Sequence, residues 1–167
     1  MTNSTTPTVT VAVRPGTSAD CDFLADAHRL GHQAVVDARG GELDILLRGR
    51  AEPIEASFGA DIDSPNHYVL VATADDLPSG YLVAEEIELR SGDTLFRVVD
   101  LWVHPSTRGI GLGSALLNNA LEIAGSRGCR GIDARALPGD RITKNFFESF
   151  GLVARTIEVF RSLEETN

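Results

Sequence analysis

Residues 98–117 read VVDLWVHPSTRGIGLGSALL, and this stretch decides the fold expected for the chain. Its apolar, largely β-branched beginning, Val98–Val103, predicts a buried strand. Pro105 ends that strand because proline has no backbone donor, and the glycine-rich loop 108–113 follows. From Ser114 onward, leucines and alanines at helical spacing predict a helix. The stretch is therefore expected to fold as a strand, a loop and a helix.

The loop before this helix has the properties of an anion-binding site. A helix that begins there directs unpaired backbone N–H groups and the positive end of its dipole into the loop. Gly109, Gly111 and Gly113 carry no side chains, so a diphosphate can approach those N–H groups closely. The sequence therefore predicts a pyrophosphate-binding loop.

Two common phosphate-binding motifs do not fit this loop. A Walker loop ends in Gly-Lys-Ser/Thr, whereas the single lysine of the chain is Lys144, far downstream. A Rossmann fingerprint has the order Gly-x-Gly-x-x-Gly, but here Arg108 precedes Gly-x-Gly-x-Gly. An acidic residue at the spacing that binds the ribose of a dinucleotide is also missing. ATP and NAD are therefore not the expected ligands.

The order Arg108-x-x-Gly111-x-Gly113, after a strand and before a helix, resembles the acetyl-CoA-binding signature of the GNAT superfamily of N-acetyltransferases. The resemblance extends over about residues 9–161 and is most specific from Val98 to Leu152. It implies an α/β (α+β) fold in which about four helices flank a mixed central sheet of six to seven strands. It also implies an acyltransferase, an N-acetyltransferase that uses acetyl-CoA as its acyl-donor cosubstrate and no metal.

Length and composition fit a single domain. The chain has 167 residues, of which 43% are hydrophobic, enough for a sizeable core. We expect one N-acetyltransferase domain over residues 9–161, between a flexible N-terminal tail, 1–8, and a C-terminal tail, 162–167. The polar start does not have the pattern of a secretion signal, and no apolar run is long enough to span a membrane. A cytoplasmic protein is therefore expected.

The charge of the chain bears on its partners. The formal net charge is −9 at pH 7, which argues against a nucleic-acid-binding face because such faces are basic. The expected partners are acetyl-CoA and an amine acceptor, without nucleic acid or membrane, and assembly as a homodimer stays open. The acidic surface is compatible with steering a cationic small molecule, although general solubility explains it more simply.

Apolar patterns and turn residues predict the remaining elements. A helix from Ala19 to about Leu30, capped by Thr17 or Ser18, follows the first strand. The strands are expected at 9–13, 67–72, 80–89, 95–103, 131–136 (a central strand) and 152–160. Further helices are expected at 42–50, at 54–58 (a turn or a short helix), from 114 until Gly128 stops it, and from Asp140, as cap, to about 150.

The resemblance assigns the cofactor site mainly to backbone groups. The strand ahead of the loop would separate from the following strand, and its free backbone groups would pair with the pantetheine arm, one N–H acting as an oxyanion donor. The Arg108 guanidinium would add a charge-assisted contact to the pyrophosphate. The cofactor-binding residues expected on this basis are Leu101, Trp102, Val103, Arg108, Gly109, Ile110, Gly111, Leu112, Gly113, Ser114, Asn145 and Phe147.

The implied reaction, direct attack of an amine on a thioester, needs a base that removes the proton of the amine. Asp100 is the first candidate, because a charge within an apolar strand needs either a partner or a function. Alternation places Asp100 and Trp102 on the same face of the strand. The alternative is that Asp100 only pairs with an arginine such as Arg97 or Arg135.

Other acids and bases are weaker candidates. Glu85, with its neighbour Glu86, lies on the preceding strand, and only one of these two carboxylates can point to a given face. His104 adjoins the loop and is a further candidate acid or base. His28 and His32 have metal-ligand spacing but no third ligand, so a solvated pair, or one that lines the acceptor site, is expected.

The chain departs from the family pattern at Phe147. Residues 140–152 resemble the pattern Asn-x-x-Ala-x-x-Leu-Tyr-Glu-Lys-x-Gly-Phe, with Phe147 in the place of the tyrosine. A phenyl ring has no proton to give to the leaving thiolate. Two functions therefore stay open, an N-acetyltransferase and a catalytically weak acyl-CoA-binding module for regulation or interaction. The resemblance implies that acceptor specificity resides in the first two helices and the loop between them, about residues 19–57. No diagnostic motif occurs there.

Overall fold

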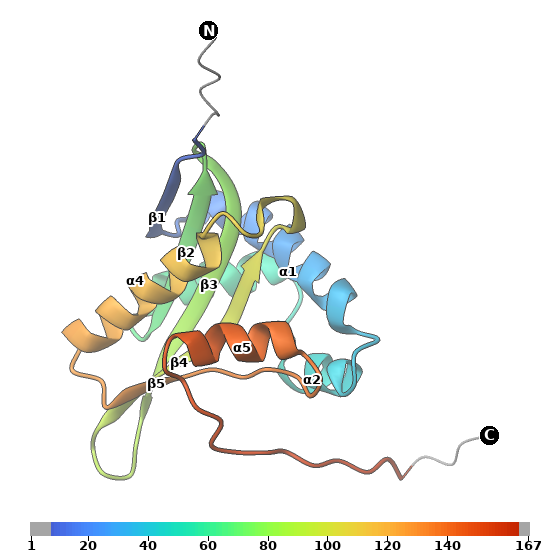
Figure 1. The fold of residues 1–167 in the computed structure, drawn as a ribbon. Coiled ribbons are helices and arrows are strands. Elements are labelled where there is room, and N and C mark those ends of the chain that lie inside the picture. The colour runs from blue at the N-terminus through green and yellow to red at the C-terminus, as the bar shows by residue number, and fades with distance from the viewer. Residues whose placement is uncertain (1–7, 164–167) are drawn as a thin grey trace, which may run out of the picture.

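A mixed five-stranded sheet forms the centre of the molecule in the computed structural model, which describes residues 8–163. Neighbouring strands from β1 to β4 are antiparallel, and β5 runs parallel to β4. The strands lie in chain order: β1 (Val11–Pro15), β2 (His67–Ala74), β3 (Leu77–Glu88), β4 (Thr94–Val103) and β5 (Gly131–Asp133). The mixed α+β architecture predicted from the sequence is confirmed (Figure 1).

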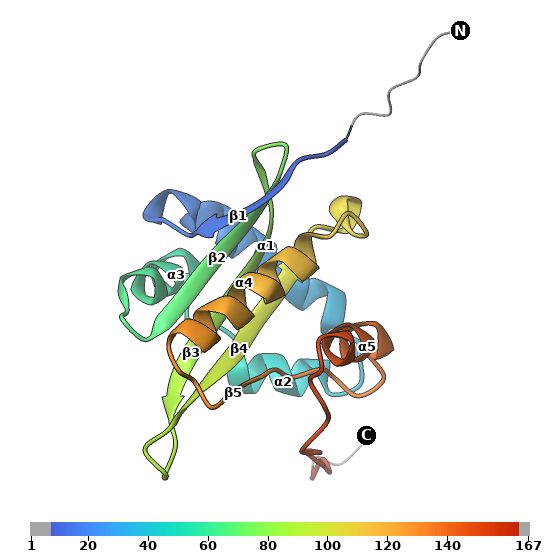
Figure 2. The ribbon, with the colours of Figure 1, turned by 60° about the vertical axis from the view of Figure 1, so that its left-hand side comes forward.

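Helices cover both faces of this sheet. α4 (Leu112–Ser126) lies across one face, and α1 (Cys21–Val35) and α3 (Ile54–Asp63) cover the other (Figure 2). α2 (Gly41–Arg48) packs beside α1, and α5 (Arg141–Ser149) follows β5. The sheet therefore separates two apolar cores, one beneath α4 and one beneath α1 and α3.

Alternation along the strands supplies both cores. In β3, Leu82 and Ala84 belong to the core beneath α4, whereas Tyr81 and Val83 belong to the core beneath α1 and α3. Successive side chains of a strand point to opposite faces of a sheet. A strand that is covered on both faces therefore needs a continuous apolar run, which the middle of β3 provides.

The predicted strand at 152–160 is wrong. Residues 152–163 have no regular secondary structure, and Val153, Ile157 and Val159 are 81%, 87% and 92% exposed. Figure 1 shows this segment leaving the end of α5 without joining the sheet. An apolar pattern makes a strand only where a neighbouring strand supplies hydrogen bonds. The described part of the chain therefore forms five strands instead of six or seven.

β5 also differs from its prediction. The strand expected at 131–136 ends at Asp133, and it lies at the edge of the sheet instead of the centre. Two predicted helices are longer than expected, since α1 continues to Val35 and α3 to Asp63. The predicted tails, 1–8 and 162–167, fall almost wholly outside the described residues. Among residues 8–163, no helix is long and apolar enough to cross a membrane.

Candidate active site

β4 has one open side over its second half. β5 pairs with β4 only from Leu95 to Arg97, where Arg97 lies opposite Asp133. From Val98 to Val103, the described residues place a strand only on the β3 side of β4. Alternate residues of a strand present their backbone N–H and C=O groups to the same edge. The carbonyl of Trp102 points to β3, near Gly80, so Leu101 and Val103 are the residues, of the three implied by the resemblance, that face the open side.

A β-bulge at Val99 determines where the acid of this strand points. Val83 lies opposite Asp100 and Ala84 lies opposite Val98, so Val99 is an extra residue in β4. A bulge breaks the strict alternation of a strand and re-aims its side chains. Val99 packs against the core beneath α1, and Asp100 reaches His28 of the same helix. The bulge thus gives Asp100 the α1 face, which it shares with Trp102 as predicted.

The glycine-rich loop connects the end of β4 to α4. Gly109 and Gly111 have φ of +85° and +95°, and a Cβ at either position would point into open space. α4 begins at Leu112, two residues before the predicted start, with Gly111 as its N-cap. The Nε of Arg108 donates to the carbonyl oxygen of Val103 at 3.3 Å. Free N–H groups of the first turn therefore lie beside an unobstructed loop and an exposed guanidinium.

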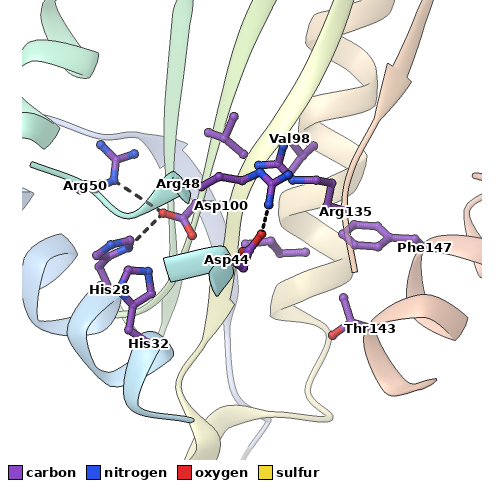
Figure 3. Close-up of a pocket in the computed structure, with 12 residues that line it drawn as sticks. His28, His32, Asp44, Arg48, Arg50, Val98, Asp100, Arg135, Thr143 and Phe147 are labelled. Carbon is purple, nitrogen blue, oxygen red and sulfur yellow. Dashed lines mark hydrogen bonds and ion pairs between the residues drawn. The ribbon is translucent and has the colours of Figure 1, made fainter. Parts of the chain in front are cut away.

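A pocket of about 310 Å³ lies beside the open part of β4, on the face that carries α1 and α2. It receives side chains from α1, α2, β4, the chain after β5, and α5 (Figure 3). The lining residues are His28, His32, Asp44, Arg48, Arg50, Val98, Val99, Asp100, Leu101, Arg135, Thr143 and Phe147. Its volume fits a small molecule.

Asp100 is held in this pocket by a buried histidine. Oδ2 of Asp100 lies 3.1 Å from Nδ1 of His28, and the hydroxyl of Tyr81 lies 3.3 Å from the same nitrogen. The His28 side chain is 3% exposed, whereas that of Asp100 is 27% exposed. Burial, followed by the charge of Asp100, holds the pKa of Tyr81 well above its ordinary value. We assign the Nδ1 proton of His28 to the bond with Asp100, because a carboxylate accepts but cannot donate.

Arg50 is the second charged partner of Asp100. Its Nε lies 3.6 Å from Oδ2 of Asp100, and its Nη1 donates to Asp61 at 2.6 Å. The guanidinium also stacks over the ring of Phe58, 3.8 Å from the ring centre. Nε of Arg50 and Nε2 of His28 are both buried without a hydrogen-bond partner in the described structure. Such unmet polar atoms cost free energy and are typical of functional sites.

Two further arginines lie on the opposite side of the pocket. Arg48 pairs with Asp44 of the same helix and, at 2.7 Å, with Glu158. Arg135 follows β5 and, within residues 8–163, forms no ion pair with a carboxylate. Burial, and then the positive charge of Arg48, lower the pKa of Arg135. The sequence-based alternative, that Asp100 pairs with an arginine, holds for a different arginine from those named. The partner is Arg50, 3.6 Å from Oδ2, whereas Arg97 pairs with Asp133 at 2.8 Å.

The predicted aromatic position lies at the pocket, but several other candidates do not. Phe147 is 8% exposed and lines the pocket opposite Asp100 (Figure 3). Asn145 is exposed on α5 and is not among the lining residues. Glu85 lies 3.7 Å from Nε2 of His67, outside the pocket. Its neighbour Glu86 accepts from Tyr68 and Arg127 on the other face of the sheet.

His104 lies at a helix cap, whereas His28 and His32 lie at the pocket. His104 caps a short 3-10 helix (Pro105–Thr107) with Nδ1 3.2 Å from the backbone nitrogen of Ser106. The rings of His28 and His32 lie 3.9 Å apart at the pocket, and burial, then the neighbouring His28, lower the pKa of His32. In the described part of the chain, no group of three His, Cys, Asp or Glu side chains is placed to hold a metal ion.

Sequence reasoning missed the arginines and the buried role of His28. Arg48 and Arg50 lie within the region expected to determine acceptor specificity, but nothing in their spacing distinguishes them from surface arginines. The i,i+4 pair of histidines was the available signal, since it indicates two rings on one helix face. That this face meets Asp100 depends on how α1 packs against β4.

A family model described as the acetyltransferase (GNAT) family matches residues 43–152. No curated protein sequence matches the chain. Among solved structures, the chain is similar to a putative acetyltransferase from Agrobacterium tumefaciens str. C58. That structure has 18% sequence identity and a TM-score of 0.71, with 90% of this chain and 99% of the other covered.

Two other structures are similar at the same level. One is an aminoglycoside acetyltransferase, meta-AAC0020, from an uncultured soil metagenomic sample, with 16% identity and a TM-score of 0.70; the match covers 92% of this chain and 97% of that one. The other is AAC(6')-Iy in complex with a bisubstrate analogue, CoA-S-monomethyl-acetylneamine, with 16% identity and a TM-score of 0.67, covering 93% and 99%. At these identities the likeness shows the fold alone.

Proposed function

Because the chain belongs to the acetyltransferase (GNAT) family, we propose that it transfers the acetyl group of acetyl-CoA directly to a primary amine, on a small molecule or an exposed protein amine. The observation that carries this proposal is the open side of β4 between the glycine-rich loop and the pocket that contains Asp100. A donor thioester laid along that side would reach from one to the other.

The backbone and loop would hold the donor. The open-side backbone groups of Leu101 and Val103 would pair with the pantetheine arm, with less support for Trp102, whose carbonyl points to β3. The N–H groups of residues 108–114 would bind the pyrophosphate. The positive φ of Gly109 and Gly111 supports this assignment, because the loop leaves open space where other residues would place a Cβ. Phe147 would lie near the thioester end, and Asn145, exposed on α5, has weaker support.

Asp100 is the proposed base. As the amine nitrogen attacks the thioester carbonyl, a C–N bond forms, the C–S bond breaks, and the proton of the nitrogen passes to the carboxylate. Oδ2 is already engaged by His28, which fixes the carboxylate and leaves Oδ1 for the acceptor. Glu85 has less support as base, because its carboxylate lies beside His67 and outside the pocket. The CoA thiolate would take its proton from water, since Phe147 has none to give.

Phe147 favours a second candidate function, an acyl-CoA-binding module with little catalysis. Release of free CoA thiol from acetyl-CoA, measured across a panel of primary amines, separates the two functions. We expect release with at least one amine and its loss in Asp100→Asn. Tight acetyl-CoA binding without thiol release from any amine would contradict the enzyme and favour the binding module.

Statements about the cellular location, the domain extent and the partners of the protein are still predictions. These are a cytoplasmic location, a single domain over residues 9–161, and a lack of nucleic-acid and membrane partners; whether the protein forms a homodimer stays open. The acidic net charge of −9 supports the statement on nucleic acid. Light scattering of the purified protein would decide the homodimer.

A further inference from the structure

One of the arginines that line the pocket has no ion-pair partner among residues 8–163. Three arginines and two aspartates face it. Arg50 is paired with Asp61 and Asp100, and Arg48 is paired with Asp44 and Glu158. Arg135 has no carboxylate partner among residues 8–163. One guanidinium therefore faces the pocket with its hydrogen-bond donors uncommitted.

The backbone explains why this guanidinium and Asp100 share one pocket. In the parallel ladder, Arg97 lies opposite Asp133, and the ladder ends there. Arg135 lies two residues beyond the end of β5, and its side chain lines the pocket. The bulge at Val99 places Asp100 on the face of β4 that borders the same pocket. An acid and an unpaired arginine therefore line one pocket across the gap between the two strands (Figure 3).

The environment of Arg135 favours an anion beside it. Partial burial is the largest cause that lowers the pKa of Arg135, and repulsion by the charges of Arg48 and Arg97 acts in the same direction, against the attraction of Asp44 and Glu158. A bound carboxylate would oppose this repulsion, and a planar guanidinium can hold a carboxylate through two parallel hydrogen bonds. The diphosphate of the donor does not meet this need, because its loop lies beyond the other end of the open part of β4.

We propose that the acceptor is a small amino acid-like molecule, whose amine faces Asp100 and whose carboxylate is bound by Arg135. This inference rests on the proposed acetyl transfer and names its acceptor class. The pocket volume of about 310 Å³ accommodates a molecule of this size. A polycationic acceptor such as an aminoglycoside would leave Arg135 without a counter-charge, which disfavours it.

The first test measures binding and does not require turnover. The probes are N-acetylglycine, N-acetylglutamate and N-acetylphenylalanine, each compared with its C-terminal carboxamide by calorimetry in the presence of CoA. We expect at least one carboxylate to bind about tenfold tighter than its amide. Arg135→Gln should remove this preference, whereas Arg130→Gln, which changes an exposed arginine paired with Asp93 outside the pocket, should retain it.

Three results would overturn the inference. They are equal affinity for every carboxylate and its amide, a preference that survives Arg135→Gln, and no binding of any probe. The second test measures CoA thiol release with free amino acids and their amides, and Arg135→Gln should raise KM for the amino acid more than it lowers kcat. Absence of release from every amine would refute the acetyl transfer, while the binding test still decides the acceptor class.

Discussion

Nδ1 of His28 lies 3.1 Å from Oδ2 of Asp100 and joins α1 to the bulged part of β4. The histidine is buried, and its other ring nitrogen has no hydrogen-bond partner in the described structure. His28 therefore acts on Asp100, and an acceptor in the pocket meets the carboxylate. His28 is a positioning residue for the proposed base Asp100, comparable to the groups that orient bases in other enzymes.

Asp100→Asn should lower kcat by about 10²- to 10⁴-fold, because an amide cannot take the proton of the amine. Acetyl-CoA affinity should change little, since the donor is held by backbone and loop. The measurement is steady-state thiol release together with calorimetry of acetyl-CoA binding. Glu85→Gln is the matched control and should retain activity within about twofold. Loss of activity in Glu85→Gln alone would reverse the assignment of the base.

His28→Gln should lower kcat less than Asp100→Asn, because it loosens the carboxylate without removing it. A double-mutant cycle tests whether His28 acts through Asp100. If His28 acts through Asp100, its substitution should have little further effect in the Asp100→Asn background, as expected for residues that act as a unit. Additive effects of the two substitutions would show that His28 acts independently. Circular dichroism checks that the buried substitution leaves the fold intact.

Gly111→Ala should reduce the magnitude of the free energy of acetyl-CoA binding by more than it lowers the free energy of unfolding. Its φ of +95° strains any other residue by about 1–2 kcal/mol, and the added Cβ would enter the open space of the loop. Gly92→Ala, at φ +86° in the β3–β4 turn, has the same strain far from the loop and serves as control. Equal acetyl-CoA affinity in the two variants, measured by calorimetry, would mean that Gly111 serves only the turn.

Phe147→Tyr should leave turnover level or raise it modestly. The ring lies at the pocket, and a hydroxyl added there would offer a proton to the leaving thiolate with little change of volume. A transplanted acid without tuned surroundings contributes less than the ~10²–10⁴-fold of an evolved one. The measurement is kcat with a working acceptor. A collapse of activity with intact folding and donor affinity would show that the site requires an apolar ring.

Asp20 should make the stability of the protein depend on pH at its acid end. Hydrogen bonds from Arg14, and further ones from Thr17, lower the pKa of Asp20 from 3.8 to about 2. A depressed carboxyl pKa adds stability that is complete above pH 3.8 and is lost as pH falls through about 2. The shift corresponds to about 2 kcal/mol at neutral pH.

Asp20→Asn should therefore lower the free energy of unfolding at pH 7 by about that amount. It should also flatten the pH dependence below pH 4 in urea titrations. Asp22→Asn, at an exposed position in α1, is the control and should lower the free energy of unfolding at pH 7 by less. A variant of Asp20 as stable as the unaltered protein would show that the ion pair with Arg14 adds nothing net.

Local sequence is sufficient for the strand, loop and helix of residues 98–117, because apolar alternation, proline and glycine act locally. It also placed Asp100 on the face of Trp102, since that follows from the backbone period of a strand. It did not determine the conformation of residues 152–160. Their apolar pattern is typical of a strand, but a strand needs a hydrogen-bonding neighbour, which the described chain does not supply.

The surroundings of Asp100 follow from the packing of elements that are distant in sequence. His28 is 72 residues away in sequence, and its contact with Asp100 depends on the packing of α1 and on one extra residue in β4. The pairing of Arg50, and the lack of a carboxylate partner for Arg135 within residues 8–163, depend on where distant elements end. Charge balance is set by three-dimensional distances, and these follow from packing between elements, which no local pattern encodes.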